Sequence, residues 1–374
     1  MQTIKLLFNG EEAFKRIIEH IQQAKETIFI NMFIWRDDRI GNIIAGELFD
    51  AAERGVQITI IKDKLGELFE KGEENKQSFF HKRYNLLSSM KARALDSMYP
   101  FLGKPKGYKQ KINPLAYKLT NHPNVYIYKE EIRNDHSKYY IFDNQVLIIG
   151  GINIEDKEIY TDVSGVKYCD YMVEMNGDEY IKEFNSQLNE GRFYKNEPTI
   201  EFIYNIKRNN TKVFKAKTEI LKLINSATSS IDLVMAYFGD RDINNAIIEK
   251  ANQGVKVTII TAQKANIQND LNRKVLKELM KKTNNKINLY LSRRMVHAKL
   301  IQVDGKVMTV GSINLNRAAL IKMYETNVLV KNYQPEFNEK LQESIRKSIS
   351  ESVKISDHNQ ITYKRVKAFL ESLV

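Results

Sequence analysis

The second half of this 374-residue chain repeats the pattern of its first half. Residues 24–33 end an amphipathic stretch and run into apolar, β-rich sequence, and residues 227–238 do the same. Residues 51–61 indicate a helix closed by a glycine and followed by a buried strand, and residues 250–260 match them. Because strand, helix, glycine and strand are typical of a βαβ unit, we expect each half to fold as an α/β layer structure.

The repeat also predicts where the chain divides. Residues 195–199, which include Pro198, interrupt both periodicities, so the first domain is expected at residues 1–197 and the second at residues 198–374. The stretch between the glycine that closes this helix and the histidine of the candidate motif described below is longer in the first half than in the second. That half therefore carries an insert at about residues 65–120.

The insert is strongly basic. Residues 79–111 hold eight lysines and arginines and one acid, and apolar residues fall near helical spacing among them. A basic amphipathic helix of this kind can lie on an anionic membrane; the alternative is a helix that caps its own domain while its charges are solvated. Residues 361–373 predict a second short amphipathic helix, which we expect to dock on the protein itself.

Composition limits the partners and the cellular location that are expected for the chain. Its formal net charge of +12 favours anionic partners such as nucleic acid or a membrane surface, although a generally lysine-rich composition gives the same excess. The single cysteine, Cys169, excludes an internal disulfide and a cysteine metal cluster. Apolar runs stay far below the ~18 residues that cross a bilayer, and residues 1–5 lack a secretion-signal pattern, so we expect a soluble or peripheral protein.

The candidate chemistry lies in two matching motifs, one in each half. Each motif has a histidine, then a lysine, then an aspartate at the same spacing: His136, Lys138 and Asp143 in the first half, and His297, Lys299 and Asp304 in the second. A Gly-x-x-Asn sequence follows each aspartate and ends at Asn153 or Asn314. Residues i and i+2 share one face of a strand, so each histidine and its lysine should point the same way.

Two such motifs that face each other suit a phosphodiester. Histidine can act as a nucleophile or as a general acid near neutral pH, lysine supplies charge to phosphate oxygens, and asparagine and serine donate neutral hydrogen bonds. One histidine can attack phosphorus while the other protonates the departing alkoxide, which needs no metal and no cofactor. The alternative is that the histidines are buried core residues whose hydrogen bonds are all made within the protein. This explains one motif but hardly a second one at the same spacing.

These motifs resemble those of the phospholipase D superfamily. Segments that are similar to its cardiolipin synthase branch lie at residues 9–11, 33–38, 52–56, 236–238 and 324–328. The resemblance implies an α/β fold of two tandem phospholipase D-like domains. Each would be a mixed β-sheet flanked by helices, and the two would pack as a pseudo-two-fold pair with one composite site at their interface.

The resemblance also implies roles for individual residues. His136 would be the nucleophile that forms a covalent phosphohistidine, and His297 the general acid and base. Phosphate would be bound by the remaining polar members of the motifs: Lys138, Lys299, Asn153, Asn314 and Ser312.

Acidic residues complete the candidate catalytic set. Glu325 and Asp170 would orient the histidines, each from the opposite half. Asp143 and Asp304 would brace the motif loops rather than touch substrate. Gly151 stands where the second half has Ser312, so the two sides of the site are unequal hydrogen-bond donors.

The leading hypothesis is a phosphatidyltransferase that resembles cardiolipin synthase and acts on glycerophospholipids. Its partner would be an anionic membrane that contains a phosphatidylglycerol-type substrate, and its location the inner face of the cell membrane, as a peripheral cytoplasmic protein. The alternatives are a phospholipase D-type hydrolase, a phosphodiesterase or nuclease, and a non-catalytic membrane-binding protein. Nucleic acid is the less favoured partner, and no protein partner is predicted.

Overall fold

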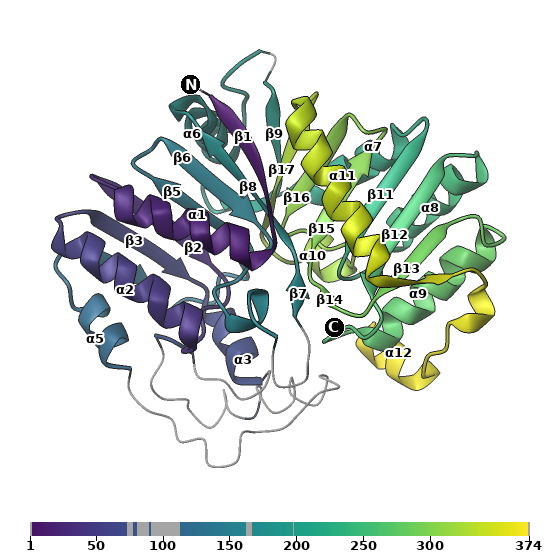
Figure 1. Cartoon of the computed structure of the whole chain (residues 1–374), viewed down its shortest axis with the longest axis horizontal. Helices are drawn as coiled ribbons and strands as arrows, with labels where there is room; N and C mark the ends of the chain where they lie inside the picture. Colours follow the sequence, from purple (N-terminus) through teal and green to yellow (C-terminus); the bar gives the residue numbers. More distant parts are fainter. Residues whose placement is uncertain are drawn as a thin grey trace.

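The structure is a computed structural model that describes residues 2–72, 78–80, 90, 113–161, 167–196 and 198–372. The described part contains two large mixed β-sheets that lie side by side with helices packed on them (Figure 1). The basic helix predicted within residues 79–111 lies almost entirely outside the described residues. No helix of the described part is both long and apolar enough to cross a bilayer.

The first sheet has the strand order β1-β8-β6-β5-β2-β3-β4. Its strands are β1 (Thr3–Phe8), β2 (Thr27–Met32), β3 (Gln57–Lys62), β4 (Val125–Tyr128), β5 (Lys138–Phe142), β6 (Val146–Gly150) and β8 (Tyr171–Asn176). The helices of this half are α1 (Asn9–Gln23), α2 (Arg39–Glu53), α3 (Lys64–Gly72), α5 (Pro114–Thr120) and α6 (Asp178–Asn185), with the short η1 (Asp156–Glu158) and η2 (Ser186–Glu190).

The second sheet has the strand order β10-β9-β17-β16-β15-β11-β12-β13-β18. Its strands are β9 (Ile200–Arg208), β10 (Thr211–Phe214), β11 (Ser230–Met235), β12 (Lys256–Ala262), β13 (Asn288–Ser292), β15 (Lys299–Val303), β16 (Val307–Gly311), β17 (Glu325–Lys331) and β18 (Ser352–Ile355). The helices are α7 (Ala216–Asn225), α8 (Arg241–Asn252), α9 (Asn269–Lys282), α10 (Arg317–Ile321), α11 (Pro335–Ser350) and α12 (Arg365–Glu371), with η3 (His358–Gln360).

The two sheets share one topology, which confirms the predicted α/β fold with mixed sheets. Strands β1-β8-β6-β5-β2-β3-β4 correspond in order to β9-β17-β16-β15-β11-β12-β13. In each half a capping aspartate, Asp38 or Asp240, starts the helix between two parallel strands. The helix is closed by Gly55 or Gly254, both at φ +95°, where a side chain would be strained.

The halves are joined at the centre of the molecule. The short strands β7 (Tyr168–Cys169) and β14 (Met295–Val296) pair in parallel across the junction. One apolar cluster contains buried residues of both sheets, among them Ile149, Val173, Val310 and Val328. The helix α11 packs against β1 of the first sheet and β13 of the second (Figure 1). The division at residues 197 and 198 stays a prediction, although the chain passes from one sheet to the other between β8 and β9.

The motif aspartates lie at the far end of their strands from the histidines. Asp143 follows β5 and accepts hydrogen bonds from the N–H groups of residues 25–27. Asp304 follows β15 and accepts hydrogen bonds from the N–H groups of residues 228–230. Both therefore fix the start of the neighbouring strand, β2 or β11, and neither belongs to the site itself.

The C-terminal helix docks on the protein as predicted, but through a different face. Helix α12 docks on the protein through Ala368 and Glu371, which are buried. Val366, Phe369 and Leu370, which we expected to face the protein, are exposed. The apolar stripe of the sequence was read as a core face, but the side of the helix that packs on α9 is small and polar.

We expect Asp304→Ala to lower the free energy of unfolding by about 2 kcal/mol, because several N–H groups lose a charged acceptor. Urea unfolding monitored by circular dichroism measures the change. Asp304→Asn, which keeps one oxygen acceptor, should lose less. Turnover per folded molecule should stay near the unmodified value, and a selective loss of turnover at unchanged stability would contradict the bracing role.

Candidate active site

The first motif lies at the start of β5. The N–H of His136 donates to the carbonyl of Tyr324 in the second half at 2.8 Å. The side-chain amide of Asn31 donates to the carbonyl of Ser137 at 2.9 Å. Lys138 is fully buried, and its ammonium donates to the carbonyl of His136. The backbone on both sides of the imidazole is thus held, in part by the opposite half.

The second motif is held in the same way from the first half. The N–H groups of His297 and Ala298 both donate to the carbonyl of Cys169, at 2.9 and 3.1 Å. Lys299 is fully buried and donates to the carbonyl of His297. Each motif strand is therefore fixed by a backbone contact that crosses the junction.

Each imidazole also meets a buried carboxylate of the other half. Nδ1 of His136 lies 3.2 Å from Oε2 of Glu325, and Nδ1 of His297 lies 2.8 Å from Oδ2 of Asp170. Glu325 and Asp170 have no exposed surface. The N–H of Tyr171 donates to the other oxygen of Asp170 at 2.7 Å. With Nδ1 engaged, Nε2 is the ring nitrogen left to each histidine for chemistry.

The two motifs act on one another electrostatically, so they form one composite site. Burial lowers the pKa of His136 well below its usual value, and the charges of Lys138 and Lys299 lower it further. Burial and the charge of Lys299 lower the pKa of His297 to about 4. Burial and Lys299 also lower the pKa of Lys138 to about 7. Both imidazoles are therefore neutral at pH 7 when no anion is bound.

The two carboxyls differ from one another. Burial raises the pKa of Glu325 to about 8, against the opposing charge of Lys138. Burial opposes ionisation of Asp170 too, but Lys299 and His297 outweigh it and hold the pKa of Asp170 below its usual value. At pH 7 the carboxyl that meets His136 is thus protonated, and Asp170, which meets His297, is ionised.

Glu158 is a site residue that the sequence analysis missed. Its Oε1 lies 3.7 Å from Nδ1 of His297 and accepts a hydrogen bond from the N–H of Asn153 at 3.3 Å. Burial and the nearby charge of Asp170 raise the pKa of Glu158 well above its usual value. The second half has Ala319 at the matching position, so a search for features common to both halves does not find it.

The group most able to hold a metal in the described part of the chain is this same cluster. Ligand atoms of Glu158, Asp170 and His297 lie within 4.8 Å of one another. Nζ of Lys299 lies 3.8 Å from Oδ2 of Asp170. A divalent ion would meet this ammonium at close range, and their repulsion opposes metal binding. Lys299 instead supplies the positive charge that the carboxylates need.

The acid beside each position explains why residue 151 is a glycine and residue 312 is a serine. The hydroxyl of Ser312 accepts a hydrogen bond from the N–H of Thr326 at 3.0 Å and also bonds to Glu325. At position 151 a Cβ atom would lie 2.4 Å from Oδ2 of Asp170. Glycine is therefore needed in the first half. Ser312, which we expected to bind phosphate, instead hydrogen-bonds to Glu325, the carboxyl of its own half.

The motif asparagines lie buried at the site. Asn153 is 1% exposed and Asn314 is 5% exposed. The amide of Asn153 donates weakly to Glu155 at 3.4 Å. Within the described residues, Oδ1 of each asparagine has no hydrogen-bond partner. Each Oδ1 is therefore an unused acceptor, to which a hydroxyl of a ligand can donate.

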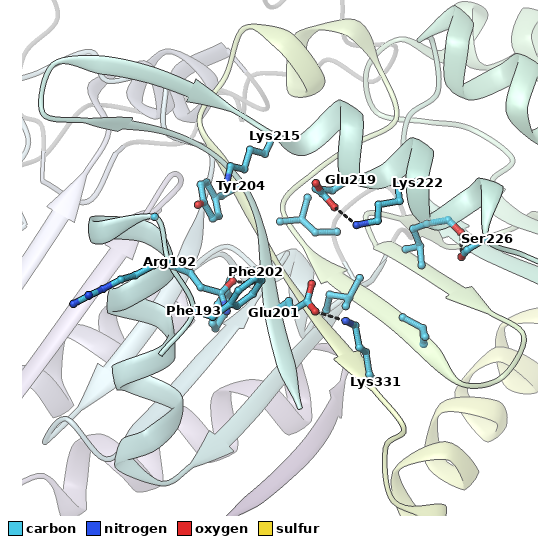
Figure 2. Close-up of a pocket in the computed structure, with 16 residues that line it drawn as sticks. Arg192, Phe193, Glu201, Phe202, Tyr204, Lys215, Glu219, Lys222, Ser226 and Lys331 are labelled. Atoms are coloured by element: carbon cyan, nitrogen blue, oxygen red, sulfur yellow. Dashed lines mark hydrogen bonds and ion pairs between the residues drawn. The ribbon is translucent and has the colours of Figure 1, made fainter. Parts of the chain in front are cut away.

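Two cavities of the structure lie away from these groups. Figure 2 shows one of about 380 Å³ that is lined by residues of β9, α7 and β17, among them Phe202 and Lys331. Lys331 ends the strand that Glu325 begins, about 20 Å along β17 from the site. A second cavity of about 730 Å³ is lined by Ser137 and Thr326. These residues alternate with the site residues along their strands, so the second cavity lies behind the site.

Two domains that each supply a His-x-Lys motif to one shared site define a protein of the phospholipase D class. A sequence profile described as "Cardiolipin synthase, PLD-like domain" matches residues 17–191 and 220–349. The chain belongs to this family and is an enzyme of the phospholipase D superfamily. The resemblance inferred from the motifs is confirmed.

Individual relatives agree with this assignment. The chain is 24% identical to a probable cardiolipin synthase of Bacillus subtilis, over 91% of its own length and 66% of that protein. It is 24% identical to a cardiolipin synthase of Listeria monocytogenes, over 94% of its own length and 70% of that protein. It thus spans about two thirds of these relatives. The crystal structure of phosphatidylserine synthase from Haemophilus influenzae shares the fold, with a TM-score of 0.73 at 15% identity over 99% of this chain and 92% of that one.

We expect Gly151→Ala to reduce turnover of a chromogenic phosphodiester by about a hundredfold, because the new methyl group displaces Asp170 from His297. Circular dichroism should show a folded protein. Gly46→Ala is the matched control, since a Cβ there would meet no atom within 4 Å. Equal activity of the two variants would contradict the role assigned to the Asp170 contact.

We expect the tautomer of His136 to change with pH through its contact with Glu325. Below about pH 8 the protonated carboxyl donates to Nδ1, so the ring proton lies on Nε2. Above that pH the ionised carboxylate accepts from Nδ1–H and leaves the Nε2 lone pair free. Long-range ¹H–¹⁵N spectra of histidine-labelled protein follow the change.

Glu325→Gln removes the titrating carboxyl and should abolish this transition near pH 8, while the spectrum of His297 is retained. A transition that persists in this variant would assign it to another group.

Proposed function

We propose that this protein is a phosphatidyltransferase that makes a cardiolipin-type lipid through a covalent phosphohistidine. The observation that carries the proposal is the composite site. Two neutral imidazoles stand beside two buried lysines, and each imidazole is oriented by a carboxyl of the opposite half. Membership of the family and the names of the cardiolipin synthase relatives support a lipid substrate.

The first half-reaction forms the covalent intermediate. When the carboxyl of Glu325 is ionised and accepts from Nδ1–H, Nε2 of His136 attacks the phosphorus of phosphatidylglycerol, and the bond from phosphorus to the glycerol oxygen breaks. His297, protonated at Nε2, gives its proton to that oxygen, so free glycerol leaves. The bound phosphodiester adds a negative charge between Lys138 and Lys299, which favours the protonated form of His297 relative to the empty site.

The second half-reaction releases the product. His297 takes the proton from a hydroxyl of a second phosphatidylglycerol, and the resulting alkoxide attacks phosphorus as the bond to His136 breaks. Lys138 and Lys299 stabilise the charge on the non-bridging oxygens, and the amides of Asn153 and Asn314 add hydrogen bonds. Both histidines return to their starting states.

Burial of the site favours transfer over hydrolysis. The side chains of His136 and His297 are 13% and 9% exposed, so water reaches the intermediate poorly while a lipid hydroxyl can be delivered from the membrane. An anionic membrane would thus be both the source of substrate and the partner, with the protein held at its inner face.

The test supplies vesicles of phosphatidylglycerol and identifies products by mass spectrometry. We expect cardiolipin and glycerol from the unmodified protein, and a loss of at least about a thousandfold in His136→Ala, which lacks the nucleophile. His297→Ala should also be inactive, and with a substrate bearing a good leaving group it should accumulate a phosphatidylated His136.

Phosphatidic acid as the only product would replace the transferase by a hydrolase. Cleavage of single-stranded DNA, offered in a parallel arm, would indicate a nuclease. Production of cardiolipin by His136→Ala at the unmodified rate would contradict the proposed nucleophile.

A further inference from the structure

Helix α12 presents an apolar face to solvent. Val366, Phe369 and Leu370 are 75%, 62% and 55% exposed. Large apolar side chains that gather on one surface, rather than scatter singly, mark a site of interaction. Figure 1 shows α12 packed under α9 near the chain end. We therefore expect this face to bind a partner.

The orientation of α12 is fixed by its polar contacts. The N–H of Leu271, in the first turn of α9, donates to Oε2 of Glu371 at 2.7 Å. The N–H of Lys364 donates to Oδ1 of Asp270 at 2.7 Å. Ala368, which is 1% exposed, fills the space between the helices. These contacts hold the apolar side chains towards solvent, so their exposure is not the result of a frayed helix end.

Cations surround the apolar face. Lys364 and Arg365 are exposed, and Lys367 is half-buried. The acids that lie near Lys367, Asp270 and Glu371, are 3.8 Å from its ammonium and already bond to backbone N–H groups. A short helix with exposed phenylalanine and leucine among lysine and arginine matches the chemistry of an anionic lipid surface.

A series of contacts connects α12 with the active site. The ring of Tyr168 lies 5.5 Å from that of His297, and the hydroxyl of Tyr168 accepts from the amide of Asn266 at 3.0 Å. Asn266 belongs to the loop that leads into α9, and the next residues of α9 bind α12. In Figure 1, α12 lies in the lower part of the view, below β7 and β14.

We infer that α12 is an interfacial docking helix that inserts Val366, Phe369 and Leu370 into an anionic bilayer. This places the site against the headgroups, so that a lipid reaches the histidines without leaving the membrane. Docking itself is independent of the proposed reaction. Its effect on turnover rests on the proposed function.

The binding test uses the full chain. Sedimentation with vesicles of phosphatidylglycerol and phosphatidylcholine is compared with vesicles of phosphatidylcholine alone. We expect the triple variant Val366→Ser, Phe369→Ser and Leu370→Ser to bind anionic vesicles at least about tenfold more weakly. The matched control changes Phe193 and Tyr194 to serine; they are 53% and 51% exposed, and Phe193 lines the distant cavity of Figure 2. This control should bind normally.

A second variant keeps the test decisive if the triple variant folds poorly. Phe369→Trp should show a blue shift of tryptophan emission on anionic vesicles, because the indole leaves water, while Trp35 is already buried and should not respond. Unchanged emission, or unchanged binding of the folded triple variant, would overturn the inference. So would a wild-type dimer that the triple variant converts to a monomer, since α12 would then be a contact between copies.

Turnover separates this inference from the proposed reaction. On short-chain phosphatidylglycerol below its micelle concentration, the triple variant should match the unmodified protein, and on vesicles it should fall about tenfold. Equal turnover of the two proteins on vesicles, despite a difference in binding, would overturn the link between docking and catalysis. If the unmodified protein acts on neither lipid, the proposed reaction fails and the vesicle-binding result still decides the docking.

Discussion

Each candidate catalytic imidazole is held by a carboxyl of the other half of the chain. Glu325 reaches His136, and Asp170 reaches His297. Backbone hydrogen bonds also connect the two halves: the N–H of His136 donates to the carbonyl of Tyr324, and the N–H of His297 donates to the carbonyl of Cys169. Neither half can therefore form a competent site by itself, and the apolar packing between the sheets is part of the catalytic design.

Burial makes this arrangement selective for anions. Two lysines without exposed surface are kept in a site whose histidines are neutral, and their charge depresses the pKa of both imidazoles. In the proposed reaction, a phosphodiester supplies the negative charge that the lysines face. Because the donors are already in place before the substrate arrives, little reorganisation is needed as charge develops in the transition state.

The sequence predicted what the two halves share, but it missed part of what they do not share. Duplicated strands and the paired motifs were visible because the same spacing occurs twice, and the family resemblance supplied Glu325 and Asp170. Glu158 escaped because its counterpart is Ala319. The need for Gly151 depends on where a carboxylate packs, which spacing alone does not reveal. The exposed face of α12 was misread because an apolar stripe indicates an amphipathic helix but does not say whether protein or lipid covers it.

The same differences between the halves support distinct roles for two otherwise equivalent histidines. Beside His136 the acid is a glutamic acid whose pKa burial raises to about 8, so the imidazole stays neutral and its Nε2 is free to attack when this carboxyl ionises and accepts from Nδ1–H. Beside His297 the acid is an ionised aspartate at 2.8 Å, which favours a proton on the ring and suits a group that gives and takes protons. In the proposed reaction, the duplicated scaffold thus binds one phosphate symmetrically, while unequal carboxyls and the glycine at position 151 divide nucleophilic attack from proton transfer.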